Sequence, residues 1–576
     1  MTHKGIYVSI NPVQHVADLR VALPEIPCCR NKSDSENQQR HRRKTARPGR
    51  DLLEPACLTL DLLRDDRVGQ RCDCLQQQIS AGRKPCGHAR VVCKGRASRG
   101  SAGVSRYKEC YSQYICATGL AYLRMRAPRT APHLSYPHPM TETNAVQYIV
   151  EGGRTLHGTI RPSGNKNAAL PIVAAALLSE STVYLDNVPH IRDIETLMEL
   201  IRSVGASIEW SGDNSLTIEA RDLVASDLDA ALCSKIRASI LLAAPLLARC
   251  GEIMLPPPGG DVIGRRRLDT HFLALEQLGA TVSLQKGLLR LHVKGFRGAD
   301  VFLDEPSVTA TENALVAACA AQGRTVLRNA ASEPHVQDLA KFLRALGAQI
   351  DGAGTNCITI DGGRPLGKAT VRHSIGPDHI EVGSFIGLAA VTRSELRIEQ
   401  AGIEHLRSTR LGFARLGIEC EEDGEDLIVP AKQTLKIQAD MGDHVPKLED
   451  QPWPAFPADT MSIAIVTATQ CDGMILMHEK MFESRLFFVD KLISMGAKIV
   501  LCDPHRAIVA GPSRLSGATL DSPDIRAGMA LLIAALCAEG RSVINNVGQI
   551  ERGYERIDFR LRALGASVDR VGDRRK

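Results

Sequence analysis

The sequence predicts an α/β protein built from six similar units that are divided between two domains. Six segments share one pattern, in which an amphipathic helix runs into a glycine and a short apolar strand follows. The glycines are Gly205, Gly279, Gly347, Gly417, Gly496 and Gly565. They lie 68 to 79 residues apart, which is too long for a solenoid repeat and too regular for chance. Six units are too many for one hydrophobic core, so three units per domain is the natural division.

The first unit shows the elements in order. Apolar residues from Ile194 to Val204 recur at helical spacing and form one stripe on a helix. We expect Gly205 to adopt a left-handed conformation and end that helix, with a strand following at ASIEW. The third and last units repeat this arrangement before Gly347 and Gly565. Short β-rich runs (STVYLDNV, LLRLHV, TVLRNA and SVINNV) lie between the helices, and this alternation is typical of α/β units.

Each unit also carries a charged or titratable residue near the start of its helix. These residues are Arg192, Arg266, His335, Glu404, Arg485 and Arg552. The N–H groups at a helix start favour anions, and arginine binds phosphate or carboxylate through paired hydrogen bonds. A solvated helix start explains any single member equally well. It explains the whole set less well, because the arginines occur in the richer motifs IGRRRLD, FESRLFF, SPDIRAG and ERGYERID.

Residues 1–139 differ in composition from the remainder. They hold 24 Lys and Arg against 11 Asp and Glu, whereas the remainder holds 47 against 54. Nine of the 17 cysteines lie there, but without the paired spacing of a zinc module. We interpret this segment as upstream sequence translated from an early start codon, with Met140 as the true start. A disordered basic tail and a functional module, such as a nucleic-acid-binding arm, are the alternatives.

The part after residue 139 has the sequence character of a cytoplasmic protein. It shows no secretory signal and no apolar run near 18 residues, so we expect no membrane partner. Its cysteines are scattered, which suits a reducing compartment. The acids are dispersed and no His/Cys cluster has ligand spacing, so we expect no metal and no cofactor. We also expect no nucleic-acid partner, and the sequence does not indicate an oligomeric state.

Three motifs carry candidate chemistry. Residues 163–171 (SGNKNAALP) place Lys166 in a glycine-containing loop before an apolar helix, where its charge could meet a phosphate. Residues 257–271 (PPGGDVIGRRRLDTH) form a loop rich in Pro, Gly and Arg that could close over an anionic substrate. Residues 453–461 (WPAFPADTM) place Asp459 where a helix begins. The alternative for Asp459 is a helix N-cap.

From about Gln147 to the C-terminus, the chain resembles the UDP-N-acetylglucosamine 1-carboxyvinyltransferase family of enolpyruvyl transferases. The resemblance is carried by ordered motifs: SGNKNAALP, IRAS, PGGDVIGRRRLD, PDHIEVGSF, WPAFPADTM, SPDIRAG and IERGYERI. It implies a two-domain inside-out α/β barrel with six βαβαββ-like repeats and an active site in the interdomain cleft. It implies a first domain over 166–375, with the mobile loop at about 257–271. The second domain would comprise 143–165 and 376–576.

The resemblance also implies a reaction and its residues. The family transfers enolpyruvyl from phosphoenolpyruvate to the 3′-hydroxyl of UDP-N-acetylglucosamine by addition and elimination, releasing phosphate, at the start of peptidoglycan precursor synthesis. By position, Asp459 matches the base. Lys166, Arg266 and Arg552 match phosphate ligands. The other matched residues fall in two groups: cleft residues Arg237, Arg485, Asp524 and Arg526, and nucleotide-sugar contacts Asn167, Ser307, Val308 and Met481.

The main departure from the family is Asp261, which stands where most members have a cysteine that donates a proton. A thiol ordinarily titrates near about pH 8.5 and an aspartate near about pH 3.9. Asp261 must therefore be desolvated by loop closure to act as a proton donor; otherwise its role is electrostatic. Fosfomycin alkylates the family's cysteine, so the resemblance and this departure together predict that the protein is insensitive to fosfomycin.

Three smaller departures leave the acceptor open. Ser484 replaces the usual asparagine, Glu305 a common lysine, and Arg267 a usual proline. They are compatible with a paralogue that has an altered acceptor or that binds a nucleotide sugar without catalysis. The shikimate-pathway enolpyruvyl transferase shares the fold and is a further alternative, although it expects a different lysine motif and a different arginine motif.

Overall fold

The computed structural model describes residues 146–224, 227–261, 263–285 and 287–572, and five short strands before residue 122. The chain divides into two compact units, Met1–His138 and Pro139–Lys576. The strands of the first unit are β1 (Ile6–Ser9), β2 (Val21–Ala22), β3 (Val92–Cys93), β4 (Ser112–Cys116) and β5 (Gly119–Ala121). Most of the predicted 1–139 extension lies outside the described residues, so its interpretation stays a prediction.

The described residues of the second unit form six β-sheets, one for each predicted repeat. One sheet contains β8 (Val183–Asp186), β9 (Ser207–Gly212), β10 (Ser215–Glu219) and β18 (Val371–Ser374). A second contains β11 (Glu252–Leu255), β12 (Thr281–Gln285) and β13 (Leu288–His292). A third contains β14 (Asp300–Phe302), β15 (Arg324–Arg328), β16 (Gln349–Asp351) and β17 (Cys357–Asp361). The fourth sheet contains β7 (His157–Ile160), β19 (Glu395–Ile398), β20 (Glu421–Asp423) and β21 (Asp426–Val429). The fifth contains β22 (Lys447–Glu449), β23 (Gly473–His478), β24 (Lys498–Asp503) and β25 (Arg506–Gly511). The sixth contains β6 (Gln147–Glu151), β26 (Thr519–Asp521), β27 (Arg541–Asn545) and β28 (Ser567–Val571).

Five of these sheets follow one plan of four strands with a parallel pair at one edge. The parallel pairs are β18–β8, β14–β15, β7–β19, β22–β23 and β26–β27. The predicted strand runs STVYLDNV, LLRLHV, TVLRNA and SVINNV are confirmed as β8, β13, β15 and β27. This common plan shows that five of the units are structural repeats, whereas the described part of the remaining sheet holds three antiparallel strands, β11, β13 and β12.

Each unit supplies one largely buried helix and one amphipathic helix. The largely buried helices are α2 (Lys166–Ala175), α5 (Ala243–Cys250), α7 (Val308–Ala320), α9 (His379–Val391), α11 (Ala458–Ala468) and α13 (Ile525–Cys537). The others are α3 (Arg192–Ser203), α6 (Asp269–Gln277), α8 (Pro334–Ala345), α10 (Arg407–Ala414), α12 (Val489–Ser494) and α14 (Ile557–Ala563). Within the described residues, no helix combines the length and apolar character needed to cross a bilayer.

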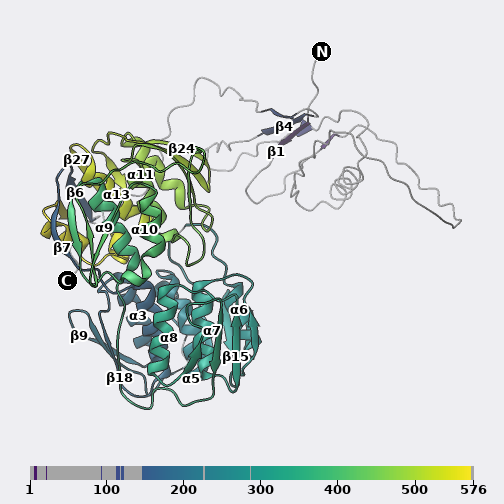
Figure 1. The fold of residues 1–576 in the computed structure, drawn as a ribbon. Helices are drawn as coiled ribbons and strands as arrows, with labels where there is room; N and C mark the ends of the chain where they lie inside the picture. The colour runs from purple at the N-terminus through teal and green to yellow at the C-terminus, as the bar shows by residue number, and fades with distance from the viewer. Residues whose placement is uncertain are drawn as a thin grey trace, which may run out of the picture. The chain divides into compact units, whose positions relative to one another are not determined.

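The helices form the interior and the sheets form the outer layer. Helices α9, α11 and α13 contact one another and are buried on all sides, whereas strands such as β8 and β10 alternate buried and more exposed residues. Figure 1 shows these three helices grouped together, and α7 and α8 grouped with α3 and α5. The predicted inside-out α/β class is confirmed, although the described sheets all have open edges and none closes into a barrel.

The buried apolar residues form two separate clusters. One draws on residues 168–375, and the other on 148–160 and 382–568. The N-terminal segment belongs to the second cluster, because β6 pairs with β27 and β28 while β7 pairs with β19. Both strands of this segment thus pair with strands from the C-terminal part of the chain. The domain boundaries at 166–375 and at 143–165 plus 376–576 stay a prediction, which the two clusters support.

The six repeat glycines all adopt the predicted positive φ. Their φ values are 93° at Gly205, 101° at Gly279, 108° at Gly347, 79° at Gly417, 106° at Gly496 and 96° at Gly565. A side chain is strained in this region of φ, ψ space, so glycine ends each helix and turns the chain into the next strand. The periodicity in the sequence therefore arises from one repeated helix-ending turn.

Candidate active site

Two basic and two acidic side chains form a connected chain of ion pairs. Lys166 Nζ lies 2.7 Å from Asp193 Oδ2, and Arg552 Nε donates to Asp193 Oδ1 at 2.8 Å. Arg552 Nη1 also donates to the carboxylate of Asp261. Lys166 begins α2, Asp193 lies in the first turn of α3, and Arg552 ends the short 3₁₀ helix η5 (Ile550–Arg552). Side chains from α2 and α3, which contribute to one apolar cluster, thus meet a side chain from η5, which contributes to the other.

Two further arginines extend this group along the loop before α6. Arg266 Nη2 donates to the backbone carbonyl of Asp261 at 2.7 Å. Arg237, at the start of the 3₁₀ helix η2 (Arg237–Leu242), donates to the carbonyls of Arg266 and Arg267. Burial lowers the pKa of Arg266, while the charges of Asp261 and Asp459 oppose that shift. Arg266 is therefore within electrostatic reach of both carboxylates.

Asp459 is held by two buried arginines. Arg485 Nη2 donates to its Oδ1 at 2.9 Å, and Arg526 Nε donates to its Oδ2 at 3.2 Å. Both guanidinium groups are almost fully buried, whereas 29% of the Asp459 side chain is exposed. Asp459 lies in the first turn of α11, and Pro457 occupies the N-cap. The N-cap alternative for Asp459 is therefore wrong.

The electrostatics of this group favour a bound anion. Burial would raise the pKa of Asp459, but the charges of Arg526 and Arg485 outweigh it and hold that pKa well below its ordinary value. Asp459 is thus an ionised hydrogen-bond acceptor at neutral pH. Nη1 of Arg485 and Nη1 of Arg526 are buried and have no hydrogen-bond partner within the described part of the chain. Buried donors without partners are costly, so these nitrogens suit a ligand that supplies anionic oxygens.

Glu479 packs against Arg485 beside its Nε atom. It is fully buried, and its Oε2 lies 3.6 Å from Arg485 Nε. Burial raises the pKa of Glu479 to about 9, Arg485 opposes the shift, and Asp450 adds to it. The carboxyl is therefore neutral near pH 7, and its approach to Arg485 is a packing contact between an acid and a cation. Glu479 was not predicted as a site residue.

We expect Glu479→Gln to become more stable than the wild type as the pH rises. Folded Glu479 keeps its proton up to about pH 9, whereas the unfolded side chain loses it near pH 4.5. The folded state therefore binds the extra proton in this window, so wild-type stability falls with rising pH and the neutral amide escapes the loss. Because one extra bound proton is worth about 1.4 kcal/mol per pH unit, the gain in unfolding free energy should be roughly 5 kcal/mol larger at pH 9 than at pH 5.

Denaturant unfolding across that pH range tests this expectation. Glu276→Gln, at an exposed glutamate on α6, is the control. A gain for Glu479→Gln that is the same at pH 5 and pH 9 would show that Glu479 is ionised in the folded state.

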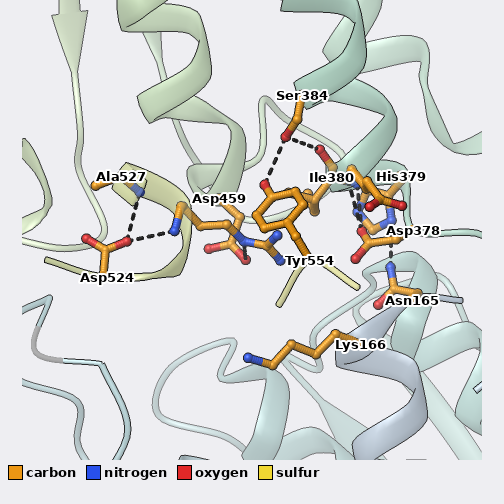
Figure 2. A network of polar contacts seen from close by, with 12 residues as sticks. Asn165, Lys166, Asp378, His379, Ile380, Ser384, Asp459, Asp524, Ala527 and Tyr554 are labelled. Carbon is orange, nitrogen blue, oxygen red and sulfur yellow. Dashed lines mark hydrogen bonds and ion pairs between the residues drawn. The ribbon is translucent and has the colours of Figure 1, made fainter. Parts of the chain in front are cut away.

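Buried polar side chains also connect the start of α2 with α9 and hold Arg526. Asn165 caps α2 by accepting from the Ala168 N–H at 3.0 Å, and its Nδ2 lies 3.1 Å from His379 Nδ1. Tyr554 exchanges a 2.9 Å hydrogen bond with Ser384, and Arg526 lies 5.3 Å from the centre of the Tyr554 ring. Figure 2 shows Asn165 and Lys166 on one side and Asp459, Tyr554 and Asp524 on the other. Tyr554 thereby fixes Arg526 beside Asp459.

The structure joins most, but not all, of the predicted site residues. Lys166, Arg237, Asp261, Arg266 and Arg552 are linked by the contacts above, as are Asp459, Arg485 and Arg526. Asp524 caps α13 by accepting from the N–H groups of Arg526 and Ala527. The remaining four have no direct side-chain contact with these groups among the contacts described: Asn167 in α2, Ser307 and Val308 at the start of α7, and Met481 after β23.

Asp193 is the main site residue that sequence reasoning missed. It contacts both Lys166 and Arg552, and it stands next to Arg192, which the repeat did single out. Within the described residues, no group of three or more His, Cys, Asp or Glu side chains could hold a metal ion. Taken together, the fold and the site define a two-core α/β protein in which buried lysine, arginine and aspartate side chains gather at one candidate site.

Comparisons with known proteins agree with this class. The family model described as EPSP synthase (3-phosphoshikimate 1-carboxyvinyltransferase) matches residues 150–561. A Bradyrhizobium diazoefficiens protein named UDP-N-acetylglucosamine 1-carboxyvinyltransferase is 73% identical over 430 residues, covering 75% of this chain and 99% of that protein. Proteins of the same name from Treponema denticola and Bacteroides thetaiotaomicron are 53% and 45% identical, with 73% and 74% of this chain and 99% of each relative covered.

Solved structures share the fold at lower identity. The enolpyruvyl transferase NikO from Streptomyces tendae aligns with a TM-score of 0.67 at 24% identity, covering 75% of this chain and all of that one. An EPSP synthase from Acinetobacter baumannii aligns with a TM-score of 0.57 at 18% identity, covering 74% and 99%. The chain therefore belongs to the enolpyruvyl (1-carboxyvinyl) transferase family.

Proposed function

We propose that this protein transfers the enolpyruvyl group of phosphoenolpyruvate to the 3′-hydroxyl of UDP-N-acetylglucosamine and releases phosphate. The observation that carries the proposal is the ionised Asp459 carboxylate beside the unpartnered nitrogens of Arg485 and Arg526. Lys166, Arg266 and Arg552 lie nearby as candidate phosphate ligands. The curated relatives at 45–73% identity share the corresponding name.

The residues divide the proposed reaction between them. Asp459 accepts the proton of the 3′-hydroxyl while the hydroxyl oxygen bonds to the substituted carbon of phosphoenolpyruvate. At the same time an acid protonates the methylene carbon. Loss of that added proton and of phosphate then restores the double bond. The arginines and Lys166 stabilise charge on the carboxylate and phosphate. Asp459 is a weak base while two arginines hold it, so a substrate carboxylate or phosphate that binds them would raise its basicity.

Asp261 is the proposed loop residue of this reaction. It acts either as the proton donor to the methylene carbon or through its charge alone. Because an aspartate carboxylate is a poor nucleophile compared with a thiolate, we also propose that the protein is insensitive to fosfomycin. The reaction would make a precursor of peptidoglycan, and the cytoplasm stays its predicted location.

The shikimate-pathway alternative has less support. The solved EPSP synthase is only 18% identical, whereas relatives named for UDP-N-acetylglucosamine reach 73%. An altered acceptor stays the second candidate, because two departures from the family lie together: Arg267 Nη1 is 3.9 Å from Glu305 Oε2, and Arg267 also pairs with Asp304. Turnover with other nucleotide sugars tests that candidate.

The decisive experiment is phosphate release by the full chain and by a protein that begins at Met140. We expect release that requires both phosphoenolpyruvate and UDP-N-acetylglucosamine, equal activity of the two proteins, and loss of activity in Asp459→Ala. Folded protein that binds the nucleotide sugar but releases no phosphate would contradict the proposal. It would favour an altered acceptor or a non-catalytic paralogue.

A further inference from the structure

Arg552, the proposed phosphate ligand, is already occupied by the protein's own acceptors. Its Nε and Nη2 donate to Asp193 at 2.8 and 3.2 Å, and its Nη1 donates to Gln549 Oε1 at 2.9 Å and to the Asp261 carboxylate. A guanidinium has five N–H donors, so four of those of Arg552 are in use. We propose that the Asp261 carboxylate occupies the anion position of Arg552 and must leave it before a substrate phosphate can bind there.

Charge balance supports this assignment. Lys166 and Arg552 supply two positive charges, and Asp193 and Asp261 supply two negative charges at hydrogen-bond distance. The group is therefore neutral as it stands, although the proposed function requires it to attract a phosphate. Displacing one carboxylate from this group of four gives it a net positive charge. A phosphate that approached with both carboxylates in place would face like charges.

Of the two carboxylates, Asp261 is the one that can be displaced. Asp193 lies in the first turn of α3, its side chain is only 6% exposed, and it contacts both cations. Asp261 lies in the loop before α6, its side chain is 17% exposed, and its carboxylate contacts Arg552. The loop therefore carries a removable anion, whereas α3 carries a fixed one.

Other contacts hold the loop in place independently of the Asp261 carboxylate. The Arg265 N–H donates to Glu483 Oε1 at 3.0 Å, the Ser484 N–H donates to the Ile263 carbonyl at 3.2 Å, and Arg266 binds the Asp261 carbonyl at 2.7 Å. Replacing the carboxylate by an amide leaves these three hydrogen bonds intact. The substitution therefore tests the anion at Arg552 without releasing the loop.

The inference rests on the proposed function and is tested through binding, not turnover. We expect Asp261→Asn to bind inorganic phosphate about tenfold more tightly than the wild type in calorimetric titrations of the full chain, because a competing like charge is removed. Asp261→Ala should show the same gain and serves if the asparagine variant does not fold. Asp269→Asn, at an acid farther along the same segment that pairs with Arg267, should leave the affinity unchanged.

The gain must also depend on Arg552. Adding Arg552→Ala to Asp261→Asn should remove it, which assigns the bound phosphate to this position. Equal or weaker phosphate binding in both Asp261 variants would overturn the inference. Failure of the proposed function would give a different result. In that case the wild type would release no phosphate from phosphoenolpyruvate and UDP-N-acetylglucosamine, whatever the affinities of the wild type and the variants for inorganic phosphate.

Discussion

Asp459→Asn is expected to lower the rate of phosphate release by about 10³-fold or more, because an amide cannot accept the hydroxyl proton. General base catalysis contributes roughly 10²–10⁴-fold. The substitution also removes the charge that Arg485 and Arg526 share, and both are buried. Their guanidinium groups would then turn toward the substrate anions or shift away, which adds to the loss. Initial rates of phosphate release with both substrates saturating measure the effect.

Stability has to be separated from chemistry in this experiment. Breaking a buried ion pair can cost about 3–5 kcal/mol, so melting curves and binding of UDP-N-acetylglucosamine should accompany the rates. Asp378→Asn is a matched control, because Asp378 is a buried carboxyl close to Arg526 that caps α9. We expect it to lower stability and keep the rate within about tenfold of the wild type. Asp459→Asn that stays folded and retains the wild-type rate would rule out Asp459 as the base.

The fold was largely predictable because its signals are local. An apolar helix stripe, a helix-ending glycine and a following strand all lie within about 20 residues. Each unit can therefore be predicted from its own sequence alone. The turn at Gly205, with φ of 93°, is set by its own backbone and its neighbours. Open sheet edges were less predictable, because strand order depends on pairs such as β6 with β27, which are distant in the chain.

Site residues could be predicted only where they lie in recognisable sequence motifs. Asp193 resembles an ordinary first-turn acid, which a helix dipole favours anywhere, and its partner Arg552 is 359 residues away. Glu479 reads as a polar residue at a strand end, and only the packing around Arg485 shows that it is buried and neutral. Asp459 was selected from its motif, and its alternative as an N-cap could be rejected only from the backbone of α11.

We propose that the protein is insensitive to fosfomycin, and we expect Asp261→Cys to make it subject to covalent inactivation by this compound. The wild type places a carboxylate beside Arg552 and Arg266. A thiol at the same position would lie next to the same positive charges, which lower the pKa of a thiol and make it a better nucleophile. The rate of time-dependent inactivation should rise by about two orders of magnitude or more over the wild type.

Mass spectrometry of the treated variant identifies the modified residue. The protein that begins at Met140 is preferable here, because nine of the 17 cysteines precede that residue. Of those after it, Cys502 is exposed and provides an internal control for unselective alkylation, while Cys233, Cys319 and Cys471 are buried. Modification at Cys502 alone, or at equal rates in the wild type and the variant, would show that position 261 confers no selective reactivity. Selective modification at 261 would instead show that this side chain lies where the arginines hold fosfomycin, an anionic epoxide. The proposed reaction requires its loop residue to lie at that same location.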